Sequence, residues 1–160
     1  MENQDIVTHA ICQFTGKHGD CITDHGYAII IYTGNTTSIN LNLYNLPPGE
    51  HGFHVHEYAD MRNGCKSLGS HYNPFYKDHG GLYGHNRHIG DLGNITVNNL
   101  GKCTQRIVVD YLPISGQHGI LGRSIVIHEK PDDYGLGGHE DSLSTGNSGE
   151  RIACGVIGRI

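Results

Sequence analysis

The sequence has no run of lysine or arginine residues that could follow a phosphate backbone, and its formal net charge is -5 with histidine neutral. Nucleic-acid binding depends on neutralising phosphates with basic side chains, so we expect no nucleic-acid partner. Long apolar segments are missing as well. No stretch reaches the roughly 18 apolar residues that indicate a membrane-spanning helix, so we expect no contact with a membrane.

The start of the chain lacks the features of a secretory signal. Residues 1–5 carry neither a positively charged region nor the beginning of an apolar one. We therefore expect a soluble, non-secreted protein with a cytoplasmic location. The glycosylation sequons that begin at Asn35 and Asn94 are then chance matches.

Two chemical motifs are also absent. None of the five cysteines has the paired spacing of a zinc finger or of a CxxC redox motif, so we do not expect thiolate ligation of a metal. The HExxH motif of zinc hydrolases is missing, because His128-Glu129 continues with Lys130-Pro131-Asp132. A hydrolase therefore has little support.

Histidine and glycine are abundant instead. The 13 histidines outnumber the 11 lysines and arginines, and a β-sheet core does not need so many imidazoles, which favours metal binding. The 24 glycines occur in short clusters that indicate tight turns. A length of 160 residues predicts one domain over residues 1–160, with residues 1–7 as a loose N-terminal segment.

Short segments with alternating apolar and polar residues indicate strands, and signals for helices are weak. In one of them Ile39, Leu41 and Leu43 share a face, which is typical of a half-buried antiparallel strand. Eight such segments predict an all-β fold, a sandwich or a barrel. They cover residues 8–14, 27–32, 37–44, 51–57, 93–97, 105–110, 123–128 and 151–157.

Two gaps between these segments are too long for hairpins, and we expect both to be functional loops. Residues 58–91 contain His71, His79, His85, His88 and Asp91. Residues 129–150 are rich in charge. Zinc accepts a set of nitrogen and carboxylate ligands, so His71, His79, His88 and Asp91 suit zinc, whereas we expect His85 to be solvated.

Residues 51–57 carry the strongest signal. Alternate residues of a strand face the same side, so His54 and His56 project together, whereas His51 lies on the packing side. His128 ends another strand, directly after an apolar run. Copper(II) favours nitrogen sites, and His54, His56 and His128 could close three sides of one.

In this order and spacing the motifs closely resemble those of the copper/zinc superoxide dismutase family over about residues 10–158. Seven ligand positions, two cysteines and an arginine match. The matching segments are residues 51–57, 64–65, 69–74, 79–81, 87–94, 126–130 and 151–158. The resemblance implies an eight-stranded antiparallel Greek-key barrel or sandwich, immunoglobulin-like, with two long functional loops.

The resemblance also implies the metal ligands. Copper would be bound by His54, His56, His71 and His128. Zinc would be bound by His71, His79, His88 and Asp91, with His71 bridging the two metals. Asp132 would accept hydrogen bonds from a copper histidine and from a zinc histidine and so orient both rings.

The implied activity is dismutation of superoxide to dioxygen and hydrogen peroxide, with copper cycling between Cu(II) and Cu(I) and zinc ordering the loop and tuning His71. His71 and Arg151 would be the catalytic residues, and Lys130 and Arg151 would guide the anion. Ser144 stands where many members carry a second lysine, so we expect weaker steering. A protein that only carries metal is the alternative, and no copper ligand or guiding arginine is missing.

The resemblance further pairs Cys65 with Cys154 in a disulfide. Cys12 is expected to pack in a strand, and nothing assigns a function to Cys21 or Cys103. Members of the family commonly form homodimers and can receive copper from a chaperone. The residues expected at the dimer contact are Tyr58, Gly155, Val156 and Ile157, with Arg159 as an unusual charge beside them.

Overall fold

The computed structural model describes residues 6–20 and 22–160, and over these residues it confirms the predicted all-β class. Val7 is anchored, because its backbone N–H donates to Ser115 Oγ at 3.0 Å. The first five residues of the segment predicted to be loose, and Cys21, lie outside the described residues. The strands are β1 (His9–Gly16), β2 (Asp24–Tyr32), β3 (Thr37–Leu43), β4 (Gly49–His56), β5 (Asp91–Val97), β6 (Cys103–Val109), β7 (Ser124–His128) and β8 (Arg151–Arg159), with one 3-10 helix, η1 (Gly64–Ser67).

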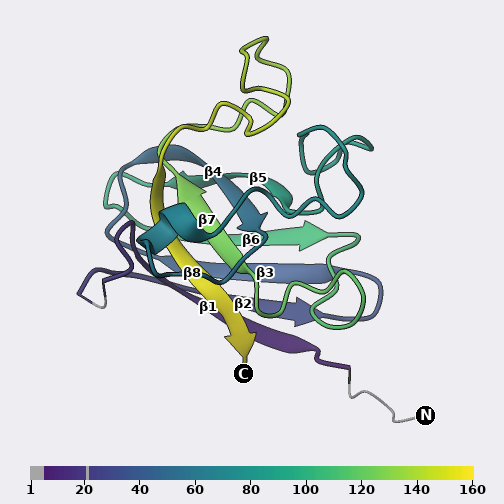
Figure 1. The fold of residues 1–160 in the computed structure, drawn as a ribbon. Helices are drawn as coiled ribbons and strands as arrows, with labels where there is room; N and C mark the ends of the chain where they lie inside the picture. The colour runs from purple at the N-terminus through teal and green to yellow at the C-terminus, as the bar shows by residue number, and fades with distance from the viewer. Residues whose placement is uncertain (1–5, 21) are drawn as a thin grey trace.

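The strands form one antiparallel sheet in the order β5-β4-β7-β8-β1-β2-β3-β6 (Figure 1). The chain crosses between the two halves of this sheet from β3 to β4, from β5 to β6 and from β6 to β7, so that β4 lies beside β7 and β3 beside β6, which gives the Greek-key arrangement. The sheet curls into a nearly closed barrel, so its two edges, β5 and β6, come together. The observed strands match the eight predicted ones, with bounds that differ by a few residues.

At the seam between β5 and β6 the described strands share no ladder of backbone hydrogen bonds. The side-chain amide of Gln105 on β6 spans the gap. Its Oε1 accepts from the backbone N–H of Thr96 at 3.1 Å, and its Nε2 donates to the carbonyl of Asn94 at 3.4 Å. One side chain therefore partly replaces the missing ladder.

The core lies inside the barrel. Ile39, Leu41 and Leu43 are all buried, as the alternation of β3 predicted, while the neighbouring Ser38 is also buried. The central strand β7 is buried along its whole length. Its outer face is covered because Val126 packs in a second apolar cluster with Cys65, Leu68 and Cys154.

Parts of the two long connections, β4 to β5 and β7 to β8, project toward the same side of the barrel, at the top of Figure 1. Strands β4 and β7 are antiparallel, with Phe53 opposite Ile127 and His54 opposite Val126, so the end of β7 lies beside the middle of β4. This register places His128 close to the histidines of β4. Among the described residues, no helix is long and apolar enough to cross a membrane.

Candidate metal centre

Strand β4 supplies two ligand-type side chains from one face. His54 and His56 are buried, with ring centroids 6.3 Å apart, while Phe53 and Val55 are buried in the barrel core. His51 has a structural role, as predicted: its Nδ1 lies 2.8 Å from the carbonyl of His128, and its Nε2 lies 2.7 Å from that of Pro47. Both nitrogens of His51 are thus occupied by backbone carbonyls.

A nitrogen-only set of possible ligands forms where β4, β7 and the first long loop meet. One ring nitrogen of each histidine lies within 4.8 Å of the others. The Nε2 atoms of His56 and His128 are 3.4 Å apart, and the rings of His54 and His71 have centroids 4.0 Å apart. The members of this nitrogen set are His54, His56, His71 and His128.

Backbone carbonyls fix the tautomers of two of these rings. Nδ1 of His56 donates to the carbonyl of Gly69 at 2.9 Å, and Nδ1 of His128 donates to that of Gly149 at 3.1 Å. A neutral ring that donates from Nδ1 keeps a lone pair on Nε2. The lone pairs of both Nε2 atoms are therefore free to bind a metal.

Two buried ring nitrogens, His54 Nδ1 and His71 Nε2, lack a hydrogen-bond partner among the described residues. A third, His79 Nδ1, faces only the carboxylate of Asp91, at 2.9 Å. A buried polar atom without a partner is costly, and each such atom in a folded protein needs an explanation. Metal ions bound at the two clusters would explain both unpartnered nitrogens, so the donor sets fit metal ions.

A second, mixed set surrounds the carboxylate of Asp91. Its Oδ1 lies 2.9 Å from His71 Nδ1, 2.9 Å from His79 Nδ1 and 3.1 Å from His88 Nδ1. Its Oδ2 accepts from the backbone N–H groups of Gly80 and His88 at 3.0 and 2.8 Å, which holds Oδ1 toward the rings. The structure thus gathers all four residues that the sequence assigns to zinc, three nitrogens and one oxygen.

Asp132 forms a hydrogen bond to one histidine of each set. Its Oδ2 accepts from His54 Nε2 at 2.5 Å, and its Oδ1 accepts from His79 Nε2 at 2.8 Å. The position of Asp132 is fixed by Asn94, whose side chain pairs with the backbone N–H and carbonyl of Asp132 at 2.7 and 3.0 Å. This role of Asn94 was not predicted from the sequence, where Asn94 stands only in a sequon and in the matching segment 87–94.

The charge state of the nitrogen set favours metal binding. Burial holds the pKa values of His54 and His56 well below the usual histidine range, and burial also lowers the pKa of His71. The pKa of His128 falls to about 4, again mainly through burial. These rings are therefore neutral near pH 7, as metal ligands must be.

His79 behaves differently. Burial alone lowers its pKa, but hydrogen bonds to Asp132 and Asp91 outweigh burial and raise the pKa to about 9. The pKa of Asp91 is lowered, because hydrogen bonds from His71, His79 and His88 outweigh its burial. The metal-free protein at neutral pH therefore holds a protonated His79 between two carboxylates.

Zinc binding to the metal-free protein near pH 7.5 is expected to release about one proton, since His79 must lose the proton on Nδ1 to become a ligand. Isothermal titration in buffers of different ionisation enthalpy measures this release. It should disappear above about pH 10, where His79 is already neutral. Heats that do not depend on the buffer at pH 7.5 would contradict the assignment.

Protonated His79 also stabilises the metal-free protein. Its contribution to the unfolding free energy is fully present below the pKa that His79 has in the unfolded chain, and it is lost as the pH rises through about 9.

A cavity of about 470 Å³ opens beside the nitrogen set. His56, His71 and His128 line it together with Arg151, which is half-buried. The Nη1 and Nη2 groups of Arg151 donate to the carbonyls of Cys65 and Gly69 at 2.8 and 2.7 Å. These bonds hold a positive charge at the cavity wall.

The other residues considered from the sequence lie farther out. Lys130 is exposed and does not line this cavity, whereas Ser144 does. His85 is exposed and belongs to neither donor set. His139, Glu140 and Asp141 form a small exposed group on the second loop.

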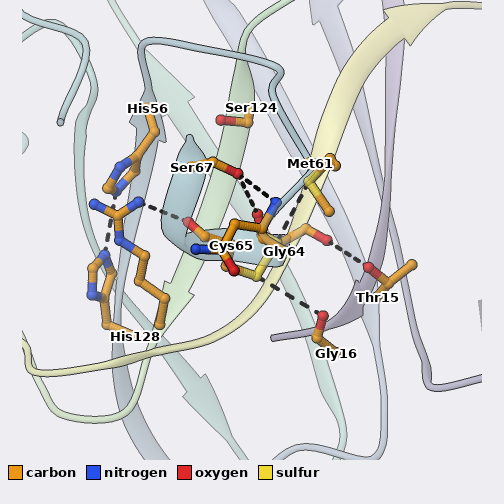
Figure 2. Close-up of a disulfide and its surroundings, with 12 residues drawn as sticks. Thr15, Gly16, His56, Met61, Gly64, Cys65, Ser67, Ser124 and His128 are labelled. Carbon is orange, nitrogen blue, oxygen red and sulfur yellow. Dashed lines mark hydrogen bonds between the residues drawn. A yellow bond between two sulfur atoms is a disulfide. The ribbon is translucent and has the colours of Figure 1, made fainter. Parts of the chain in front are cut away.

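The predicted disulfide between Cys65 and Cys154 is present. It joins the first long loop to β8, and the carbonyl of Cys65 is one of the groups that hold Arg151. Figure 2 shows Cys65 and Gly64 packed between the first strand at Thr15 and Gly16 and the rings of His56 and His128. Cys12 and Cys103 are buried free thiols, and burial raises the pKa of each.

Comparison with known proteins agrees with this geometry. The family model described as copper/zinc superoxide dismutase (SODC) matches residues 25–157. A solved structure, described as that of the clock protein EA4, is 42% identical with a TM-score of 0.91, and the match covers 100% of this chain and 99% of that one. The chain thus belongs to the copper/zinc superoxide dismutase family.

Proposed function

We propose that the protein converts superoxide to dioxygen and hydrogen peroxide. The observation that carries this proposal is the position of His71, which belongs to both donor groups. Its Nδ1 lies 2.9 Å from Asp91, while its Nε2 is buried without a hydrogen-bond partner. One imidazole that joins a nitrogen-only set to a mixed set supports a redox metal beside a structural one.

The proposed ligands are those expected from the sequence. Copper would be held by His54, His56, His71 and His128. Zinc would be held by His71, His79, His88 and Asp91. Copper, when bound, supplies one-electron transfer in both directions, and zinc does not change its oxidation state.

The side chains of the protein would orient the ligands and deliver a proton. Two superoxide anions and two protons give one dioxygen and one hydrogen peroxide. His71 would hold one of these protons on Nε2 and release it toward the product, and the second would come from solvent. Asp132 would keep His54 and His79 in fixed orientations throughout, because it holds the opposite nitrogen of each ring.

Arg151 would attract and orient the substrate. Superoxide is an anion and the chain has a net charge of -5, so encounter depends on a local positive field. Arg151 provides that field at the wall of the cavity that His56 and His128 line. Lys130, which is exposed, would contribute only at longer range.

The test is superoxide turnover by the copper- and zinc-loaded protein, with metal content measured on the same sample. The Arg151→Ala variant is expected to lower kcat/KM by about tenfold, with a smaller difference at high salt. Arg106→Ala is the matched control, since Arg106 is an exposed arginine on β6 outside this cavity. Full metal loading without turnover would refute the proposed function.

A metal-carrying protein without turnover is the second candidate function. Its support is that the similar solved structure is described as that of a clock protein and not as that of a dismutase. The presence of every proposed copper ligand and of Arg151 at the cavity favours the enzyme. Measuring turnover against metal content, as above, separates the two candidates.

A cytoplasmic homodimer, supplied with copper by a chaperone, is our proposal for the protein in its cell. Tyr58 and Val156 expose apolar surface that could meet a partner copy, with 53% and 38% of each side chain accessible. Gly155 and Ile157 are buried within the protomer and would support the contact only indirectly, while Arg159 is exposed. Sedimentation at micromolar concentration is expected to give a dimeric mass, and a monomeric mass would contradict this.

A further inference from the structure

A second cavity, of about 490 Å³, lies on the disulfide side of Arg151. Three segments that are distant in the sequence form it: the turn after β1, the disulfide loop around η1, and the approach to β8. We call it the basic pocket. Its charged and titratable lining residues are Lys17, His18, Arg62, Lys66, Glu150 and Arg151.

The charge of the basic pocket is opposite to that of the whole chain. Four of the 11 lysines and arginines line it, and Glu150 is the one carboxylate among the described lining residues. The chain as a whole has a net charge of -5. Positive groups gathered in a concave site focus a field that raises the local concentration of anions.

The two lysines of the basic pocket are available to a ligand. Lys17 and Lys66 are exposed, and neither has a carboxylate within 4.0 Å over residues 6–20 and 22–160. Arg62 is partly engaged, because its Nε and Nη2 donate to Asp60 at 2.9 Å. Arg151 already donates to two carbonyls and contributes mainly its charge.

The basic pocket is distinct from the cavity beside the nitrogen set. Gly149 and Arg151 line both, but Lys17, Arg62 and Lys66 line only the basic pocket. None of these last three residues belongs to a donor set for metal. An anion bound there would therefore use cations that the proposed dismutation does not need.

We propose that the basic pocket binds an anion that carries two or more phosphate-type groups. Lysine and arginine are the side chains that bind such groups, lysine as a point charge and arginine through its planar fork. The four cations outnumber the two carboxylates near them, Glu150 in the lining and Asp60 beside Arg62, so a positive charge remains for a ligand. A multivalent phosphate-type anion uses this charge best.

Inorganic pyrophosphate is the probe, titrated calorimetrically into the copper- and zinc-loaded protein at low ionic strength. We expect one molecule to bind per chain. The Lys17→Gln/Lys66→Gln double variant is expected to weaken binding by at least about tenfold. The matched control, Lys102→Gln/Arg106→Gln, removes two exposed charges outside the pocket and should keep the original affinity.

Other outcomes would overturn the proposal. Equal weakening by both double variants would show a general charge effect. Pyrophosphate that still binds to the lysine variant but not to Arg151→Ala would lie in the cavity beside the nitrogen set instead. Absence of binding would also refute it. The readout is independent of superoxide turnover, so failure of the proposed function would leave this result unchanged, and circular dichroism would confirm that each variant is folded.

Discussion

Replacing His128 by alanine is expected to abolish superoxide turnover while zinc binding persists. His128 contributes one nitrogen to the nitrogen set and none to the set around Asp91. Loss of a residue that only orients a ligand already costs about 10- to 100-fold in metal affinity, so loss of a ligand should lower turnover by more than about 100-fold. Metal analysis beside a superoxide assay measures both effects.

His85→Ala is the control for this variant. His85 is an exposed histidine on the first long loop, outside both donor sets, so the substitution removes an imidazole without touching a ligand. It should keep turnover and both metals. Turnover by His128→Ala close to that of the unchanged protein would show that the nitrogen set is not the redox site.

Removing the disulfide has the second large expected effect. The Cys65→Ser/Cys154→Ser variant is expected to lose about 4–5 kcal/mol of unfolding free energy, because the bridge closes a loop with a sequence separation of 89 residues and restricts the unfolded chain. Urea denaturation of the metal-free protein should show a lower midpoint. The reductant-treated native protein should lose a similar amount, whereas the variant should not respond to reductant.

Loss of the disulfide should also disturb Arg151 at the cavity beside the nitrogen set. The carbonyl of Cys65 accepts a hydrogen bond from Arg151 at 2.8 Å, so a loosened loop would leave the guanidinium less well placed. We expect kcat/KM to fall even where the protein remains folded. A variant as stable as the native protein would show that the bridge does not restrain the unfolded chain.

Strand patterns made much of this architecture predictable. The alternation in β3 placed Ile39, Leu41 and Leu43 in the core, and the alternation in β4 separated His51 from His54 and His56. Such patterns depend only on the two-residue period of a strand. Ser38 is an exception: it lies on the opposite face of β3 and is still buried, because other parts of the fold cover that face there.

The support of the metal site could not be predicted in the same way. The groups that hold His56 and His128 are the carbonyls of Gly69 and Gly149, and every residue has a carbonyl, so no side-chain pattern marks them. Asn94 holds Asp132 from 38 positions away in the chain. The basic pocket likewise joins segments that only the folded chain brings together.

The seam that Gln105 spans affects how the protein meets other copies of itself. An exposed strand edge offers unpaired N–H and carbonyl groups to any other strand, and it is a common starting point of aggregation. In this barrel the two edges face each other, and the amide of Gln105 occupies groups on both Thr96 and Asn94. A substitution at Gln105 would therefore free two backbone groups on the β5 edge for pairing with another strand, so this position bears on solubility more than on catalysis.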